Sequence, residues 1–126
     1  MNRSRIAKTN RTKGHNYERK LTNLYKEAGF IDALTSRNCD RVLDSCKVDI
    51  AKVPFYPQCK AGYPAMSVND YIKIFMEMDE KLKAYKMPLE PFIIHHRKGR
   101  KKYHDLTIIP TEHFFLLIKK IISNVY

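Results

Sequence analysis

Three polar residues in the middle of the chain, Asp49, Gln58 and Lys60, have types and a spacing suited to hydrolytic chemistry. If the chain turns at Val53-Pro54, position 49 lies opposite position 58 or 59 of the next extended segment. Gln58 and Lys60 are two residues apart, so they share one face of that segment. A carboxylate and an amide oxygen can bind a hard divalent cation, and an ammonium group can neutralise charge on a phosphate or position the attacking water. Such a cation lowers the pKa of its bound water, which favours hydrolysis of a phosphate ester.

The elements that must position these residues are indicated by the spacing of the apolar side chains. Apolar residues at helical spacing predict three helices, over residues 16–28, 69–85 and 111–125. Short apolar runs between polar or proline residues predict extended segments over residues 33–37, 41–43, 48–51, 55–60, 91–96 and 103–109. This order predicts an α/β fold with a mixed β-sheet flanked by helices. Glu18, in the first turn of the first helix, can bring a second carboxylate to the edge of that sheet.

Positive charge is concentrated in two blocks. The 126 residues include 24 Lys and Arg and 13 Asp and Glu, which gives a net charge of +11. Residues 1–20 carry seven bases and one acid, and residues 97–102 carry five bases and no acid, so these blocks account for the whole excess. Concentrated blocks favour a polyanionic partner bound through its phosphates, the alternative being two solvated charge runs. We expect residues 1–12 to form a flexible basic arm and residues 13–126 to form a single domain.

A longer pattern surrounds the polar residues and resembles a known family. It consists of Gly14-x-x-x-Glu18-Arg19-x-Leu21, Gly29-Phe30, Ser36-Arg37, Val48-Asp49-Ile50 and Gln58-Cys59-Lys60. This pattern, over about residues 13–60, resembles the PD-(D/E)XK nuclease superfamily, and within it the small Holliday junction resolvases of archaeal and phage type. The resemblance implies a restriction-endonuclease-like fold and a Mg²⁺-dependent endodeoxyribonuclease, with Mn²⁺ as a substitute ion. It also implies a homodimer that cuts branched DNA.

The resemblance assigns roles to individual residues. Glu18, Asp49 and Gln58 match the metal ligands, and Lys60 matches the lysine that assists the attacking water. Gln58 stands where the family usually has glutamate, which removes one negative charge and should lower the affinity for metal. The charge blocks and the Ser-Arg pair give the expected DNA-binding residues: Arg3, Arg5, Lys8, Arg11, Lys13, Arg19, Ser36, Arg37, Arg97, Lys98, Arg100, Lys101 and Lys102.

Several alternatives remain at this level. The chain can instead be a nucleic-acid-binding protein without catalysis, on a nuclease fold that lost activity through Gln58, or a nuclease for linear DNA or RNA. Arg37 can be a plain surface cation, and Asp44, a rival for Asp49, is interpreted as a turn residue or as a residue that supports the site from beside it. The final helix is apolar on more than one face, which predicts either burial between layers or a subunit contact.

The chain offers no candidate membrane span and no signal peptide, which predicts a cytoplasmic protein, in the host cytoplasm if the gene is viral. A short stand-alone domain of this kind would suit a phage genome. The three cysteines, Cys39, Cys46 and Cys59, match no zinc-site spacing, and we expect them to be buried free thiols.

Overall fold

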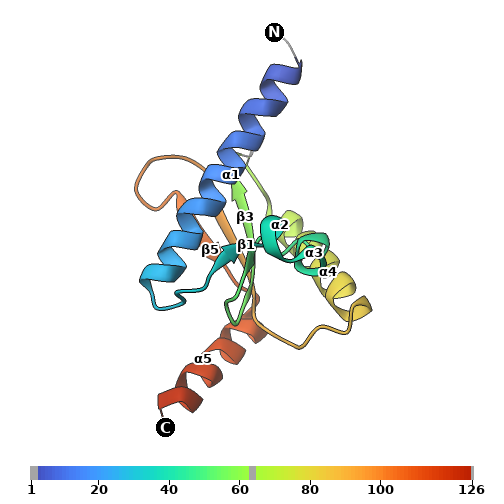
Figure 1. Cartoon of the computed structure of the whole chain (residues 1–126), viewed down its shortest axis with the longest axis vertical. Helices are drawn as coiled ribbons and strands as arrows, with labels where there is room; N and C mark the ends of the chain where they lie inside the picture. The colour runs from blue at the N-terminus through green and yellow to red at the C-terminus, as the bar shows by residue number, and fades with distance from the viewer. Residues whose placement is uncertain (1–2, 63–64, 126) are drawn as a thin grey trace.

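The computed structural model describes residues 3–62 and 65–125, with side chains described for residues 11–62 and 65–124. It is a mixed α/β structure (Figure 1). The helices are α1 (Arg3–Glu27), α2 (Ser36–Cys39), α3 (Arg41–Ser45), α4 (Val68–Ala84) and α5 (Thr111–Val125). The strands are β1 (Leu34–Thr35), β2 (Ile50–Ala51), β3 (Tyr56–Ala61), β4 (Phe92–Arg97) and β5 (Asp105–Ile108).

The strands form two sheets. In the larger sheet the order is β3-β4-β5, with β3 parallel to β4 and β5 antiparallel to β4. The smaller sheet pairs β1 with β2 in antiparallel fashion. The mixed sheet expected from the sequence is therefore confirmed. Because β3 is the first strand in the order, one of its edges is left open toward the segment that contains Asp49.

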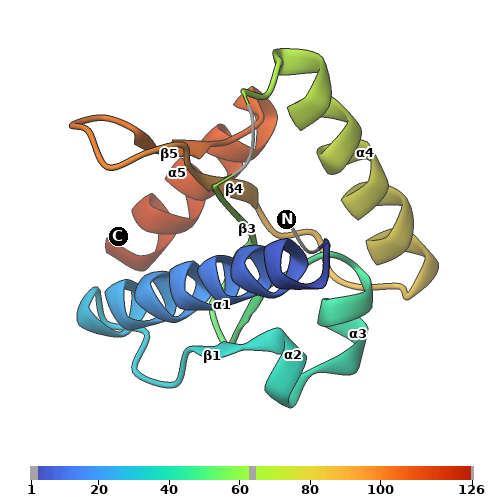
Figure 2. The same ribbon diagram turned by 90° about the horizontal axis from the view of Figure 1, so that it is seen from above.

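Two apolar clusters hold helices against the strands. On one side, Tyr17 and Leu21 of α1 pack with Ile50 and Ala61. On the other side, the side chains of α3 and α4 pack against Val48 and the strands; this cluster contains Leu43, Cys46, Val48, Ala51, Tyr56, Met78, Leu82 and Phe92. Alternate residues of β3 belong to the two clusters, so α1 and α4 cover opposite faces of this strand (Figure 2).

Most predicted elements are found, with shifted ends. The first helix ends at Glu27, and Gly29 follows with a positive φ of 122°, while the amide of Phe30 donates to the carbonyl of Tyr25. Helix α4 begins after Ser67, whose side chain forms a reciprocal capping box with Asp70. The last helix spans residues 111–125 as expected.

Three expectations about the backbone are wrong. The segment expected to be extended over residues 33–37 is a strand only at Leu34–Thr35, and Ser36 and Arg37 begin helix α2. Residues 41–43 are helical in α3, not extended, because the Asp40 side chain accepts a hydrogen bond from the Leu43 amide and caps the helix. Helix α1 begins at Arg3 rather than at residue 16. The helix thus runs through the segment expected to be a flexible arm, which is rich in helix-favouring Arg, Lys and Ala. In the described part of the chain, no helix has the length and apolar character needed to cross a membrane.

Candidate functional site

Asp49 lies at the open edge of β3 and is fixed by both its backbone and its side chain. Its amide donates to the carbonyl of Pro57 (2.7 Å), and its own carbonyl accepts from the amide of Ser36 (2.8 Å). Its Oδ2 accepts hydrogen bonds from the Cys59 amide (2.7 Å) and from Gln58 Nε2 (3.3 Å). The carboxylate of Asp49 therefore accepts from the Cys59 amide, which the sheet leaves unpaired. These bonds fix the position of Asp49 relative to β3.

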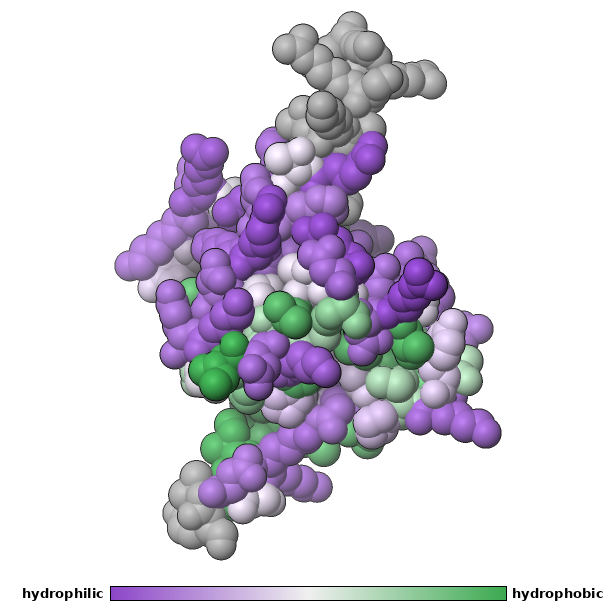
Figure 3. All heavy atoms as spheres, in the orientation of Figure 1, coloured by the Kyte–Doolittle hydropathy of each residue, from purple (hydrophilic) through white to green (hydrophobic). Residues whose placement is uncertain are grey.

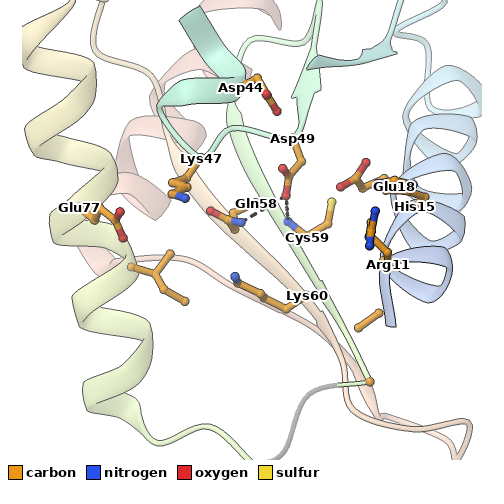
Figure 4. Close-up of a pocket in the computed structure, with 14 residues that line it drawn as sticks. Arg11, His15, Glu18, Asp44, Lys47, Asp49, Gln58, Cys59, Lys60 and Glu77 are labelled. Carbon is orange, nitrogen blue, oxygen red and sulfur yellow. Dashed lines mark hydrogen bonds between the residues drawn. The ribbon is translucent and has the colours of Figure 1, made fainter. Parts of the chain in front are cut away.

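A cleft of about 760 Å³ surrounds this carboxylate, between α1 and α4. The four residues expected to carry the chemistry, Glu18, Asp49, Gln58 and Lys60, all line it. In Figure 4, Glu18 reaches toward Asp49 from α1, while Gln58 and Lys60 point into the space between β3 and α4. The convergence predicted from the two-residue period of an extended segment is thus present in the structure.

The cleft changes the acidity of Asp49. Burial of the carboxyl raises its pKa from 3.8 to about 7, and the negative charges of Glu18 and Asp44 add to the rise. The hydrogen bond from the Cys59 amide and the charge of Lys60 act in the opposite direction. A cation placed near Asp49 would stabilise its ionised form and lower this pKa.

Glu18 has a cationic partner on α2, Arg37, which is not among the residues that line the cleft. Arg37 Nε lies 3.1 Å from Glu18 Oε2, and the two side chains are 31% and 15% exposed. This ion pair joins α2 to α1. Arg37, a candidate for phosphate binding, is thus occupied with a carboxylate in the structure as it stands.

The donor set was examined for its fit to a divalent cation. Glu18 and Asp49 supply two carboxylates, and Mg²⁺ is commonly held by one or two carboxylates together with water and substrate phosphates. Among the described residues, no cluster of three or more Asp, Glu, His or Cys side chains could hold a metal. Gln58 turns its amide nitrogen, not its oxygen, toward Asp49, so a third protein ligand would require rotation of this amide. Glu18 and Asp49 are therefore the two residues that would hold a divalent cation if one binds in this cleft.

Other polar side chains that sequence reasoning missed or discounted also line the cleft. They are His15 on α1, Asp44 on α3, Lys47 before β2 and Glu77 on α4, and the expected DNA contact Arg11 on α1 lines the cleft as well. Lys47 has a left-handed backbone, with φ 68°, and stands two residues before Asp49. The two-residue period gave no signal for it, because a left-handed residue is not part of an extended segment. Asp44 lies in α3 and not in a turn, but it lines the cleft and its charge raises the pKa of Asp49, which agrees with the alternative that it supports Asp49.

The two basic blocks of the sequence lie together at one end of the larger sheet, where strands β3 and β4 both finish. The pairing of Ala61 with Arg97 puts the ends of β3 and β4 side by side, and the Gly62 amide donates to the Arg97 carbonyl (3.3 Å). The side chain of Lys13 also approaches Gly62: a Cβ built there would lie 3.6 Å from Lys13 Cδ. We call this surface, made by Arg11 and Lys13 of α1 and by residues 97–102, the basic edge. Hydrophilic side chains cover this part of the molecule (Figure 3).

The remaining candidates for DNA contact differ in their accessibility. Ser36 is fully buried, so it has no surface with which to bind a phosphate, and that expectation is not supported. Arg97 lies over the ring of Tyr17, 5.2 Å from its centroid, and Arg19 donates to Asn16 Oδ1 (2.7 Å). Exposed side chains are found at Arg11, Lys13, Arg19, Arg37, Lys98, Arg100, Lys101 and Lys102. The side chains of Arg3, Arg5 and Lys8 lie outside the described residues.

All three cysteines are free, as expected, but only Cys46 is buried as a residue. Cys59 is half-buried beside Asp49, and burial raises the pKa of its thiol. Cys39 is exposed on α2, so the expectation that it is buried is wrong.

Comparisons of the chain with protein-family models, curated proteins and solved structures found no match. The functional interpretation therefore stands on the site.

Proposed function

We propose that this chain is a metal-dependent endodeoxyribonuclease on a restriction-endonuclease-like fold, acting on branched DNA as a Holliday junction resolvase does. The observation that carries the proposal is the convergence of Glu18, Asp49, Gln58 and Lys60 in one cleft. Phosphodiester hydrolysis needs groups that neutralise the phosphate, orient the water and hold a cation, and this set supplies them. The resemblance of residues 13–60 supports branched DNA as the substrate class.

Each residue has a defined task in this proposal. Glu18 and Asp49 would hold Mg²⁺ as anionic ligands, and Gln58 would add a neutral third ligand if its amide rotated. When bound, Mg²⁺ supplies acidity to water and neutralises charge on the phosphate. Lys60, whose charge already lowers the pKa of Asp49, adds its ammonium beside the scissile phosphate. The basic edge next to the cleft binds the flanking phosphates of the same DNA.

A test compares a labelled four-way junction with a matched linear duplex, in Mg²⁺ and in EDTA. We expect nicks in the junction that require the metal, and their loss in Lys60→Ala and Asp49→Ala. Lys52→Ala, an exposed lysine outside the cleft, is the matched control and should cut as the wild type does. Cleavage that persists in Asp49→Ala would contradict the proposed site, and equal cutting of both DNAs would contradict the resolvase assignment.

Gln58 supports a second candidate, a nucleic-acid-binding protein without catalysis. Its amide is neutral, is buried and donates to Asp49, so in this arrangement it does not present an oxygen beside that carboxylate. This candidate predicts salt-sensitive binding of DNA without cleavage in Mg²⁺ or Mn²⁺. Gain of cleavage in Gln58→Glu, with a silent wild type, would identify a degenerate site.

Paired cuts across a junction need two sites, and we propose that two chains associate through α5. Among its exposed side chains are Phe114, Phe115, Ile121 and Ile122, between 44% and 56% exposed. Hydrophobic side chains appear around this helix in Figure 3. Such a surface is typical of a protein contact.

A further inference from the structure

The loop that joins β4 to β5, residues 98–104, is a tight and strongly basic turn. The Lys98 amide donates to the His104 carbonyl (2.8 Å), and the His104 amide donates to the Lys101 carbonyl (3.1 Å). Gly99 packs so closely on the His104 ring that an added Cβ would lie 2.9 Å from Nδ1. The loop therefore has a defined conformation and can present a side chain in a fixed direction.

Tyr103 is the side chain that this loop presents. It is 78% exposed, the highest value among the exposed large hydrophobic side chains of the described residues. Its backbone is left-handed, with φ 64°, which is unfavourable for a bulky aromatic residue. An exposed ring on a strained backbone adds little to the stability of the fold, so its presence is better explained by a ligand.

The surroundings of Tyr103 indicate the chemistry of that ligand. Lys102 Nζ lies 5.1 Å from the ring centroid, and Lys98, Arg100 and Lys101 are exposed on the same loop. An aromatic ring surrounded by cations is suited to a partner that is both flat and anionic. A nucleotide has these properties, because its base stacks on the ring while its phosphates contact the cations.

The position of the loop links this ligand to the cleft. The loop leaves β4 at Arg97, which pairs with Ala61 at the end of β3, while Lys60 of the cleft pairs with His96. One nucleic acid can therefore contact the basic edge, the loop and the cleft together. Bases inside an intact duplex do not expose their faces, so the base on Tyr103 must be unpaired or lie at a helix end.

We propose that Tyr103 is a stacking platform for an unpaired base, or for the last base pair of an arm, beside the cleft. The inference rests on the proposed action on DNA. Stacking on Tyr103 would make the protein selective for DNA with exposed base faces.

The test measures binding in EDTA, where no cleavage occurs, to a gapped duplex containing 2-aminopurine and to a closed, hairpin-capped duplex. We expect Tyr103→Ala to weaken binding of the gapped duplex about tenfold and to leave the closed duplex unchanged. Tyr103→Phe should retain the wild-type affinity and the quenching of 2-aminopurine fluorescence. Tyr85→Ala is the matched control, since Tyr85 is 52% exposed beside Lys83 and Lys86 at the far end of α4.

Salt titration separates stacking from phosphate contact. Tyr103→Ala removes no charge, so the salt dependence of its DNA binding should equal that of the wild type. Lys101→Gln removes one charge, so the slope of the logarithm of the binding constant against the logarithm of the salt concentration should become smaller by about one on both DNAs. Equal loss on the closed duplex, or unchanged affinity for the gapped one, would overturn the stacking role. The stacking role would also be overturned if the wild type bound neither DNA, or if it bound poly-glutamate more tightly than DNA. A stacking effect in a protein that never cleaves would refute the nuclease proposal and leave this inference standing.

Discussion

Arg37 Nε lies 3.1 Å from Glu18 Oε2, so a cation already pairs with one of the two carboxylates of the candidate metal site. A divalent ion must share Glu18 with this guanidinium or displace it. The positive charge of Arg37 thus offsets the negative charge of Glu18 in the absence of a metal. Without Arg37, two unpaired carboxylates would face each other.

Removal of this partner should strengthen metal binding. We expect Arg37→Ala to bind Mn²⁺ about two- to fivefold more tightly than the wild type, the range that a partly exposed ion pair allows. Mn²⁺ titration followed by electron paramagnetic resonance measures the affinity, and Arg41→Ala, an exposed arginine on α3, is the control. An affinity equal to or weaker than that of the wild type would show that Arg37 orients Glu18 instead of competing for it.

The buried carboxyl of Asp49 should make the protein less stable as the pH rises. Its pKa is about 7 in the folded state and near 3.8 in the unfolded chain, so the folded state binds the extra proton between these values. Its contribution to the free energy of unfolding is therefore full below pH 4 and is lost as the pH rises to about 7. At about 1.4 kcal/mol per pKa unit, the loss has a ceiling of about 4 kcal/mol.

Asp49→Asn removes this titration. In EDTA, we expect the variant to match the wild type near pH 4 and to be more stable above pH 7, as measured by urea denaturation. Asp32→Asn, which changes an exposed carboxyl, should show no such pH-dependent gain. A difference between Asp49→Asn and wild type that is constant with pH would show that the Asp49 carboxyl does not titrate in this range.

His95 should act in the opposite direction over nearly the same range. Burial lowers its pKa from 6.5 to about 4, and its ring nitrogens lie 2.7 Å from Tyr25 Oη and 2.9 Å from Thr107 Oγ1. The unfolded chain takes up a proton at this histidine first, so its contribution to stability is present above pH 6.5 and is lost as the pH falls to about 4. We expect His95→Gln to be less stable than the wild type at pH 7.5, with the difference shrinking toward pH 4.

The contributions of these two groups have opposite slopes, so they partly cancel each other in the stability profile of the wild type. In Asp49→Asn, the free energy of unfolding should then rise with pH because of His95. In His95→Gln, it should fall with pH because of Asp49. His104→Gln, on the β4–β5 loop, serves as the control for replacement of a histidine. Parallel profiles of His95→Gln and wild type would exclude His95 as a titrating group.

The sequence predicted the central part of the site because the relevant contacts are local. Gln58 and Lys60 share a face through the period of the strand, and the short connection to residue 49 limits where Asp49 can lie. Helix ends were predictable where one residue type dictates the backbone, as at Gly29 and Ser67. The segment 41–43 was not, because a three-residue apolar run fits a strand or a helix and only the cap at Asp40 decides.

The rest of the site depends on contacts between distant segments. Neither the ion pair of Arg37 with Glu18 nor the meeting of Lys13 with Arg97 near Gly62 follows from spacing along the chain. The role of Ser36 was misjudged for a related reason: its neighbour Arg37 is exposed, while Ser36 itself turns inward and its amide bonds to Asp49. Burial of this kind is set by packing of α2 and β2, which no local pattern specifies.

The exposed apolar side of α5 leads to the last prediction. Phe114, Ile121 and Ile122 follow the i, i+7, i+8 spacing of one helical face, and each is about half exposed. If two chains pair through this face, Ile122→Glu should raise the dissociation constant of the dimer at least about tenfold, since burying an isoleucine contributes about 1.5–3 kcal/mol. Ser123→Glu adds the same charge at the next, exposed position and is the matched control. Light scattering across a dilution series gives the mass, and circular dichroism checks that both variants fold. A wild type that is monomeric at every concentration, or an Ile122→Glu protein that dimerises as the wild type does, would exclude α5 as the contact.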